Sequence, residues 1–234
     1  MDVLEKRSWS RLSVYVKIIL TTTLFLNLFA TAAILLLEFS NPNTLGMLEG
    51  FWSKLLAAWF HGVTPRTAGF NTLDIGALTA ATSVLMLLLM FIGGAPNSTA
   101  SGIKISTFFI LITATKSFLQ GNLNVNFFGR SLSRETLLKA LATTTIGMAT
   151  IFVAVFMLTI FVEDDFLDIA FEAVSAFGTV GLSRGTTSEL GTPGQLIIMA
   201  VMLIGRLGPL TLGYTLTVRH KSRINYATTE FPVG

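Results

Sequence analysis

The chain carries one tetrapeptide twice, as Thr67-Ala68-Gly69-Phe70 and as Thr179-Val180-Gly181-Leu182, with positions 67 and 179 lying 112 residues apart. The same interval separates residues 91–99 from the similar residues 203–211. Chance matches would not keep one offset, so these two pairs of segments indicate a duplicated unit. Each tetrapeptide precedes a long apolar segment that contains glycine. This layout predicts a membrane pore with a filter made of backbone.

The composition of the 234-residue chain is typical of a membrane protein. Hydrophobic residues make up 52% of it and charged residues 12%, and the mean hydropathy is +0.70, whereas a soluble domain carries about 25% charged residues. The absence of cysteine excludes disulfides and thiolate metal sites. His61 and His220 lie far apart and no nucleophile is paired with a base, so we predict neither an enzyme nor a bound cofactor. The net charge of +3 is weak support for a nucleic-acid partner, and we expect none.

The apolar segments predict an all-α transmembrane fold. A spanning helix needs about 20 apolar residues, and the candidates are residues 12–37, 78–91 continued by 103–115, 137–162 and 195–218. Two amphipathic stretches, 48–61 and 166–176, are too short to span and directly precede the tetrapeptides, so we interpret them as re-entrant pore helices. The prediction is two helix–pore helix–filter–helix repeats, residues 1–120 and 121–234, the second ending in a cytoplasmic tail.

Lysine and arginine predict the orientation, because they are enriched in the cytoplasmic loops of membrane proteins. They cluster before the first span, between the repeats and after the last span, which places both termini in the cytoplasm. The outer side has few basic residues and nine acids: Glu38, Glu49, Asp74, Glu163, Asp164, Asp165, Asp168, Glu172 and Glu189. We expect the acidic face to concentrate cations and its cluster at residues 163–172 to be a solvated loop and not a catalytic carboxylate site. Arg66 and Arg184 are expected to pack beside the filters or pair with these acids.

The tetrapeptides suit a filter because rings of backbone carbonyls can replace the hydration shell of a monovalent cation. Gly69 and Gly181 provide positions without a Cβ, which enter positive φ freely. The alternative is that these glycines only let helices pack closely. The repetition at one interval, each time after a short amphipathic helix, favours the filter.

Three strings resemble the Trk/Ktr/HKT superfamily of potassium transporters, and most of all the membrane subunits of bacterial Ktr systems: Thr64-Pro65-Arg66-Thr67-Ala68-Gly69-Phe70-Asn71, Ser175-Ala176-Phe177-Gly178-Thr179-Val180-Gly181-Leu182-Ser183 and Ile204-Gly205-Arg206-Leu207-Gly208-Pro209-Leu210-Thr211. The resemblance implies K+ bound at the carbonyls of Gly69 and Gly181, with the rest of both tetrapeptides as ligands. It also implies a ring of four repeats, of which this chain resembles the third and fourth. We therefore expect a C-terminal fragment that lacks two preceding repeats; the alternative is that two copies complete the ring.

The segment 93–102 cannot be regular helix, because it holds three glycines and a proline. By resemblance it is the intramembrane loop that gates the pore, formed by Gly93, Gly94, Asn97, Ser98, Thr99, Ser101 and Gly102. Arg206, which matches Gly94 at the common interval, is expected to hold this loop closed and to add a positive barrier to K+. The alternatives are a simple kink and an arginine that pins neighbouring helices. Lys104 is expected only to reach toward the cytoplasm.

The resemblance further implies K+ uptake, with Na+ as a coupling ion, across a bacterial inner membrane. The expected partners are membrane lipid, a second membrane subunit in a homodimer and cytosolic nucleotide-binding regulatory subunits of the RCK type. Two alternatives stay open. One is a Na+-preferring or unselective cation transporter, and the other is a truncated, non-conducting membrane scaffold.

Overall fold

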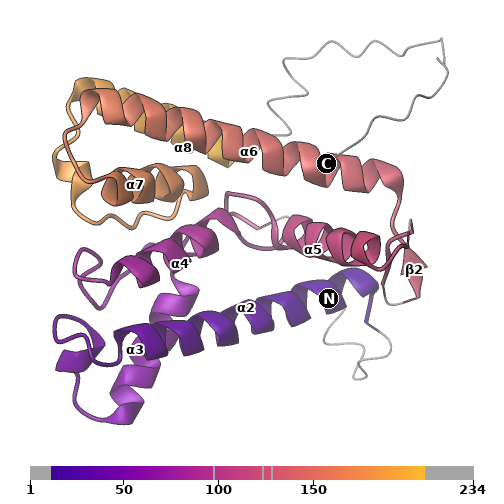
Figure 1. The fold of residues 1–234 in the computed structure, drawn as a ribbon, viewed down its shortest axis with the longest axis horizontal. Coiled ribbons are helices and arrows are strands. Elements are labelled where there is room, and N and C mark those ends of the chain that lie inside the picture. Colours follow the sequence, from indigo (N-terminus) through magenta and orange to yellow (C-terminus); the bar gives the residue numbers. More distant parts are fainter. Residues whose placement is uncertain (1–11, 97, 123, 128, 209–234) are drawn as a thin grey trace.

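Two long helices frame the molecule (Figure 1). The structure is a computed structural model, and it describes residues 12–96, 98–122, 124–127 and 129–208. The long helices are α2 (Val14–Glu38) and α6 (Arg134–Phe161), and among the described helices these two are long and apolar enough to cross a membrane. Each begins at a serine whose hydroxyl accepts a hydrogen bond from a backbone N–H of the first turn, Ser13 for α2 and Ser133 for α6. Both helices match predicted spans.

Three shorter apolar helices and two amphipathic helices fill the space between the long ones. The apolar helices are α4 (Ala80–Phe91), α5 (Ile105–Leu119) and α8 (Thr192–Leu207), and the amphipathic helices are α3 (Phe51–Val63) and α7 (Phe166–Gly178). The order long helix, short helix, loop, third helix occurs twice, and α4 and α8 begin 112 residues apart. α8 continues through the positions that match the break after α4, up to Leu207. The predicted remainder of that span, residues 209–218, lies outside the described residues.

The fold is mostly helical, as predicted, but it is not all-α. A short antiparallel hairpin, β1 (Asn126–Phe127) and β2 (Arg130–Ser131), lies in the connection between α5 and α6, and two 3-10 turns lie at Leu45–Met47 (η2) and Thr186–Ser188 (η3). The hairpin pairs Asn126 with Ser131 and Phe127 with Arg130. Two residue pairs are too few for a hydrophobic pattern of period two, so the sequence carries no visible signal for these strands.

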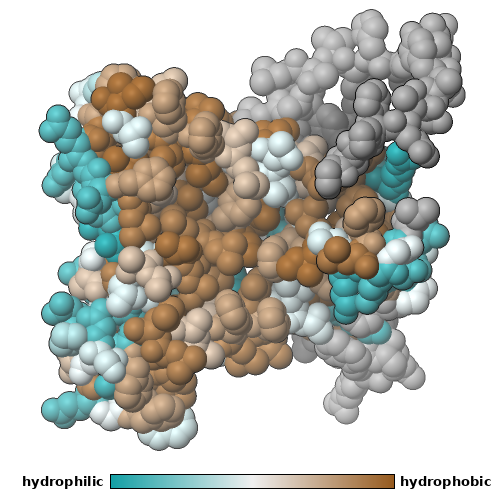
Figure 2. Space-filling view, viewed as in Figure 1, coloured by the Kyte–Doolittle hydropathy of each residue, from teal (hydrophilic) through white to brown (hydrophobic). Residues whose placement is uncertain are grey.

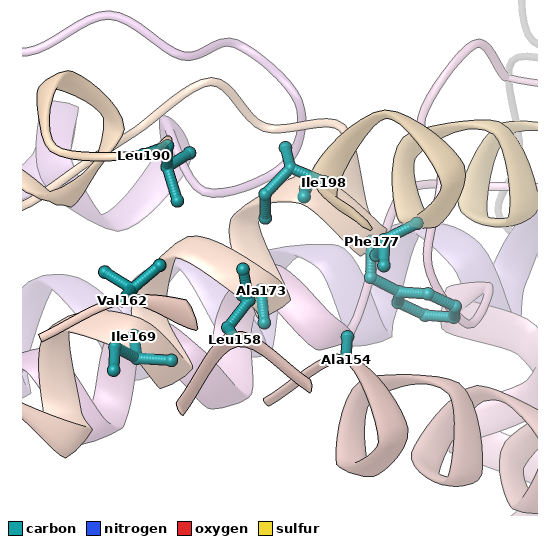
Figure 3. Close-up of a cluster of buried hydrophobic side chains, with 10 residues drawn as sticks. Ala154, Leu158, Val162, Ile169, Ala173, Phe177, Leu190 and Ile198 are labelled. Atoms are coloured by element: carbon teal, nitrogen blue, oxygen red, sulfur yellow. The ribbon is translucent and has the colours of Figure 1, made fainter. Parts of the chain in front are cut away.

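The largest buried cluster surrounds α7 (Figure 3). Leu158 and Ala154 of α6, Ala173 and Phe177 of α7, and Ile198 of α8 pack together there. α7 lies between α6 and α8 on one side and α4 on the other (Figure 1). In contrast, α3 packs mainly against α2. The second short helix is therefore enclosed by protein, whereas the first is covered on one side only.

Apolar side chains also cover much of the outer surface. Figure 2 shows a broad hydrophobic band with hydrophilic residues toward the two ends of the long axis. Phe25 on α2 is 65% exposed and Phe152 on α6 is 73% exposed. Exposing such a large apolar surface to water is unfavourable. The surface is suited to contact with the hydrocarbon core of a bilayer, which is about 30 Å thick.

Candidate ion-filter site

The two tetrapeptides follow the C-termini of α3 and α7 and share an unusual backbone. Thr67 and Gly69 have φ angles of 64° and 73°, and Thr179 and Gly181 have φ angles of 47° and 90°. Positive φ is a genuine outlier for a β-branched residue, and within the described residues only these two threonines, among non-glycine residues, adopt it. Such strain persists where the surroundings impose it, and it often marks functional sites.

The two loops touch through their backbones. A Cβ placed on Gly69 would lie 2.2 Å from the carbonyl oxygen of Val180. The hydroxyl of Thr67 donates a hydrogen bond to the carbonyl oxygen of Gly178, at 3.2 Å. Residues more than 100 positions apart in the sequence therefore form one continuous site, which we call the filter loops (residues 67–70 and 179–182).

Most carbonyl oxygens of the filter loops have no donor. Within the described part of the chain, no hydrogen bond reaches the carbonyl oxygens of Thr67, Ala68, Gly69, Thr179, Val180, Gly181 or Leu182. The carbonyl oxygen of Phe70, also predicted as a ligand, accepts a hydrogen bond from Thr64 Oγ1 at 2.6 Å, which leaves one lone pair for an ion. Backbone oxygens without a donor need another partner. The C-terminal, negative ends of α3 and α7 also favour a cation here.

The side chains of the two loops differ in their surroundings. Val180 and Leu182 are 4% and 3% exposed and pack against Ile75, Leu78 and the α4 side chains Met86 and Met90, in the first half of the chain. Their counterparts at the common interval are Ala68, which is exposed, and Phe70, which is 71% exposed. The second loop is thus supported from behind, while the described residues leave Phe70 of the first loop largely exposed.

The segment between α4 and α5 is a loop whose ends are fastened together. Gly93 N donates to Ile103 O at 2.8 Å, Ile103 N to Phe91 O at 3.0 Å, and Ile105 N to Gly94 O at 3.1 Å. A Cβ on Gly93 would lie 1.8 Å from the carbonyl oxygen of Ser101, so only glycine fits at this crossing. Of the predicted gate residues, Asn97 lies outside the described residues.

The loop is held from three directions. The guanidinium of Arg206 donates to the carbonyl oxygen of Thr99, and the ammonium of Lys104 donates to that of Ala100. The hydroxyl of Thr179, in the second filter loop, donates to the hydroxyl of Ser101 at 2.8 Å. A cavity of about 360 Å³ lies beside these contacts, lined among others by Ser101, Lys104 and Arg206. The loop thus contacts two cationic side chains and the second filter loop through three consecutive residues, 99–101.

Several polar residues have contacts that differ from the expectation. Lys104 contacts the loop instead of only reaching toward the cytoplasm. Glu172 is 7% exposed, so this member of the predicted solvated cluster is buried, and Glu38 is fully buried as well. The carboxylate of Glu38 accepts hydrogen bonds from Thr79 N and Oγ1, at 2.9 and 2.7 Å, and so holds the start of α4. Arg184 forms an ion pair with Asp168, in agreement with the expected pairing with an outer acid. Arg66 instead donates a hydrogen bond to the side chain of Asn27.

The arrangement shows no conventional metal centre. Within the described residues, no group of three or more histidine or acidic side chains could hold a metal ion. The site instead offers backbone oxygens, which replace the hydration shell of alkali cations in pores.

Comparison with known proteins identifies the family. The family model described as "TrkH: Cation transport protein" matches residues 4–226. The chain belongs to the TrkH family of cation transport proteins. Members of this family transport ions and are not enzymes, as predicted. The Ktr system potassium uptake protein B of Bacillus subtilis is 45% identical over 100% of this chain and 52% of its own length. The potassium/sodium uptake protein NtpJ of Enterococcus hirae is 33% identical over 98% of this chain and 51% of its own length.

A solved structure of the TrkH family agrees with the fold. The potassium transporter TrkH from Vibrio parahaemolyticus superposes with a TM-score of 0.71 at 20% identity, over 84% of this chain and 43% of the other. The chain thus spans about half the length of the TrkH-family relatives that it matches.

Proposed function

We propose that this chain forms one half of a K+ pathway through a bacterial plasma membrane. The observation that carries the proposal is the pair of filter loops, with the same strained backbone in both and seven carbonyl oxygens that accept no hydrogen bond within the described residues. K+ would shed water at these carbonyls, chiefly those of Gly69 and Gly181. The names of the relatives in Bacillus subtilis and Enterococcus hirae, which specify potassium and potassium/sodium uptake, support this choice of ion.

The exposed Phe70 supports the further proposal that the pathway needs other repeats. Leu182, at the matching position, is buried against the first half of this chain, so a preceding repeat would bury Phe70 in the same way. Four such repeats would close a ring of carbonyls around one axis. The chain then supplies the repeats 1–120 and 121–234, with both termini in the cytoplasm.

The loop 93–102 is proposed as the gate of this pathway. The hydrogen bond that Ser101 accepts from Thr179, in the second filter loop, supports this role. The Arg206 guanidinium on the Thr99 carbonyl would add positive charge there. A cation that leaves the filter would meet this charge while the loop is closed. Membrane lipid, a second membrane subunit and nucleotide-binding regulatory subunits are the proposed partners, with Na+ as the proposed coupling ion and no bound cofactor.

The test is K+ uptake by a bacterial strain without its own K+ uptake systems. The chain is expressed alone and together with the first half of the Bacillus subtilis relative, with membrane insertion verified by immunoblot. Uptake in either case supports a K+ pathway, and uptake by the chain alone indicates that two copies complete the ring. Inserted protein without uptake in both cases would contradict the proposal and favour a non-conducting scaffold.

A second experiment separates K+ selection from a Na+-preferring or unselective pathway. Replacing Gly69 with Ser should reduce the preference for K+ over Na+ if the Gly69 carbonyl belongs to a K+ filter. An unchanged ratio of the two uptake rates would favour the alternative.

A further inference from the structure

One largely buried side chain joins the segments that follow the two filter loops. The guanidinium Nε of Arg184 donates to the Asp168 carboxylate in the first turn of α7. Its Nη1 donates to the carbonyl oxygens of Ile75 and Leu78, at 3.1 and 3.3 Å, and to Ser83 Oγ of α4 at 2.6 Å. The Arg184 side chain is only 12% exposed. Charge-assisted bonds of this kind are stronger and shorter than neutral ones.

The partners of Arg184 belong to both halves of the chain. Arg184 itself lies three positions after Gly181, and Asp168 lies on the helix that leads into the second filter loop. Ile75 and Leu78 lie in the segment that leads from the first filter loop to α4. The backbones are also close, because a Cβ on Gly76 would lie 3.0 Å from the Arg184 carbonyl oxygen. The guanidinium therefore fixes the distance between the two segments.

Among the described residues, this connection has no counterpart at the positions related by the 112-residue interval. The residue 112 positions before Arg184 is Thr72. Gln195, which matches Ser83, donates to the carbonyl oxygen of Leu190 in its own loop, at 3.2 Å. The two halves share the tetrapeptide pattern, but at this position the first half has a threonine and the second an arginine. The contact between the segments that follow the two filter loops is therefore asymmetric.

We infer that Arg184 is a positioning residue that sets the spacing of the two filter loops and thereby contributes to the discrimination between K+ and Na+. The inference rests on the proposed function. Selection between these ions depends on the size and stiffness of the carbonyl cage. The planar fork of arginine can bind a carboxylate and several carbonyls at once in a fixed geometry, which the single ammonium of lysine cannot do.

The test compares Arg184→Gln, Arg184→Lys and Lys54→Gln in the uptake assay. Lys54 provides the control for positive charge, because it lies on the same predicted outer side and donates to Phe39 O, away from the filter loops. We expect Arg184→Gln to reduce the ratio of the Na+ to the K+ half-saturation constant by about tenfold, Arg184→Lys to reduce it less, and Lys54→Gln to leave it unchanged. A loss only in maximal rate, equal for both ions, would overturn the inference.

A structural measurement keeps the inference testable without transport. Nitroxide labels on the exposed residues Thr72 and Glu189 report the distance between the two outer segments by electron spin resonance. Arg184→Gln should broaden or shift that distance distribution, and an unchanged distribution would overturn the inference. If Gly69→Ser alters ion selection and Arg184→Gln does not, the inference fails while the proposed function stands. If the wild type inserts but transports no K+, the proposed function fails, whatever the labels show.

Discussion

Gly69 and Gly181 occupy matching positions in the filter loops, but their surroundings differ. A Cβ on Gly69 would approach Val180 O to 2.2 Å, whereas a Cβ on Gly181 would meet no atom closer than 3.8 Å, both at positive φ. An alanine at either position is strained by the positive φ. At Gly69 the crowding adds an overpacking cost of about 1–3 kcal/mol, and at Gly181 it does not. We expect Gly69→Ala to reduce K+ selectivity or uptake at least about tenfold more than Gly181→Ala. Equal effects, measured as K+ and Na+ uptake, would contradict the crowding of the two loops.

Ser101 gives a second prediction at the residue scale. Its hydroxyl accepts the hydrogen bond from Thr179 that joins the loop 93–102 to the second filter loop. A hydrogen bond contributes about 0.5–1.5 kcal/mol, so Ser101→Ala should raise the basal K+ flux about two- to tenfold by weakening the closed loop. Thr179→Ser keeps the donor hydroxyl, so it should not raise the basal flux. Ser98→Ala, in an exposed part of the same loop, is the matched control. If Ser98→Ala changed the flux as much as Ser101→Ala does, the proposed role of the Ser101 hydroxyl would be refuted.

At the scale of elements, two cationic side chains contact the loop 93–102. Arg206 and Lys104 bind the carbonyl oxygens of Thr99 and Ala100, two consecutive residues. We expect Arg206→Ala and Lys104→Met each to raise the K+ flux. The increase in the double variant should be smaller than the sum of the two single increases, because both side chains hold one loop. Arg130→Ala, an exposed change in β2, controls for the loss of basic charge. Unchanged or lower flux through a stably inserted Arg206→Ala protein would exclude a gate held closed by this arginine.

The packing of α8 against α7 gives a stability prediction. A Cβ on Gly205 would lie 2.0 Å from the backbone carbonyl oxygen of Phe177, whereas a Cβ on Gly147 would meet the ring end of Phe177 at 3.1 Å. A ring can rotate and a helical backbone cannot move freely, so Gly205→Ala should destabilise the protein by about 1–3 kcal/mol and Gly147→Ala by less. Thermal unfolding in detergent measures both. A smaller loss for Gly205→Ala than for Gly147→Ala would contradict this packing.

The sequence predicted most elements but not the contacts between them. Apolar length and the break at residues 93–102 indicated the helices, because these signals are local. The tetrapeptides were recognisable because they recur at one interval. The bonds of Arg184 to Ile75 and Leu78 join residues more than 100 positions apart, and the burial of Glu38 depends on the position of Thr79. No pattern of neighbouring residues encodes such pairs, so the sequence did not predict them.

For the whole molecule, the uneven burial of two similar units is the main observation. α7 is enclosed by α4, α6 and α8, whereas α3 leaves Trp52 73% exposed and Leu56 66% exposed. Exposed aromatic and aliphatic side chains of this size indicate a lipid or protein contact. Because α3 corresponds to the enclosed α7, the parallel favours protein at the side of the first filter loop and supports a ring with further repeats.

The absence of cysteine makes this proposal directly testable. A single cysteine at Phe70 should react quickly with a water-soluble maleimide in the chain alone, because Phe70 is 71% exposed. It should be protected at least about tenfold when two further repeats are present, since burial limits thiol reactivity. Leu182→Cys, at the matching and 3% exposed position, should be protected in both samples. Equal reactivity of the Phe70→Cys protein in both samples would show that no other repeat covers the first filter loop, and a four-repeat ring would then be excluded.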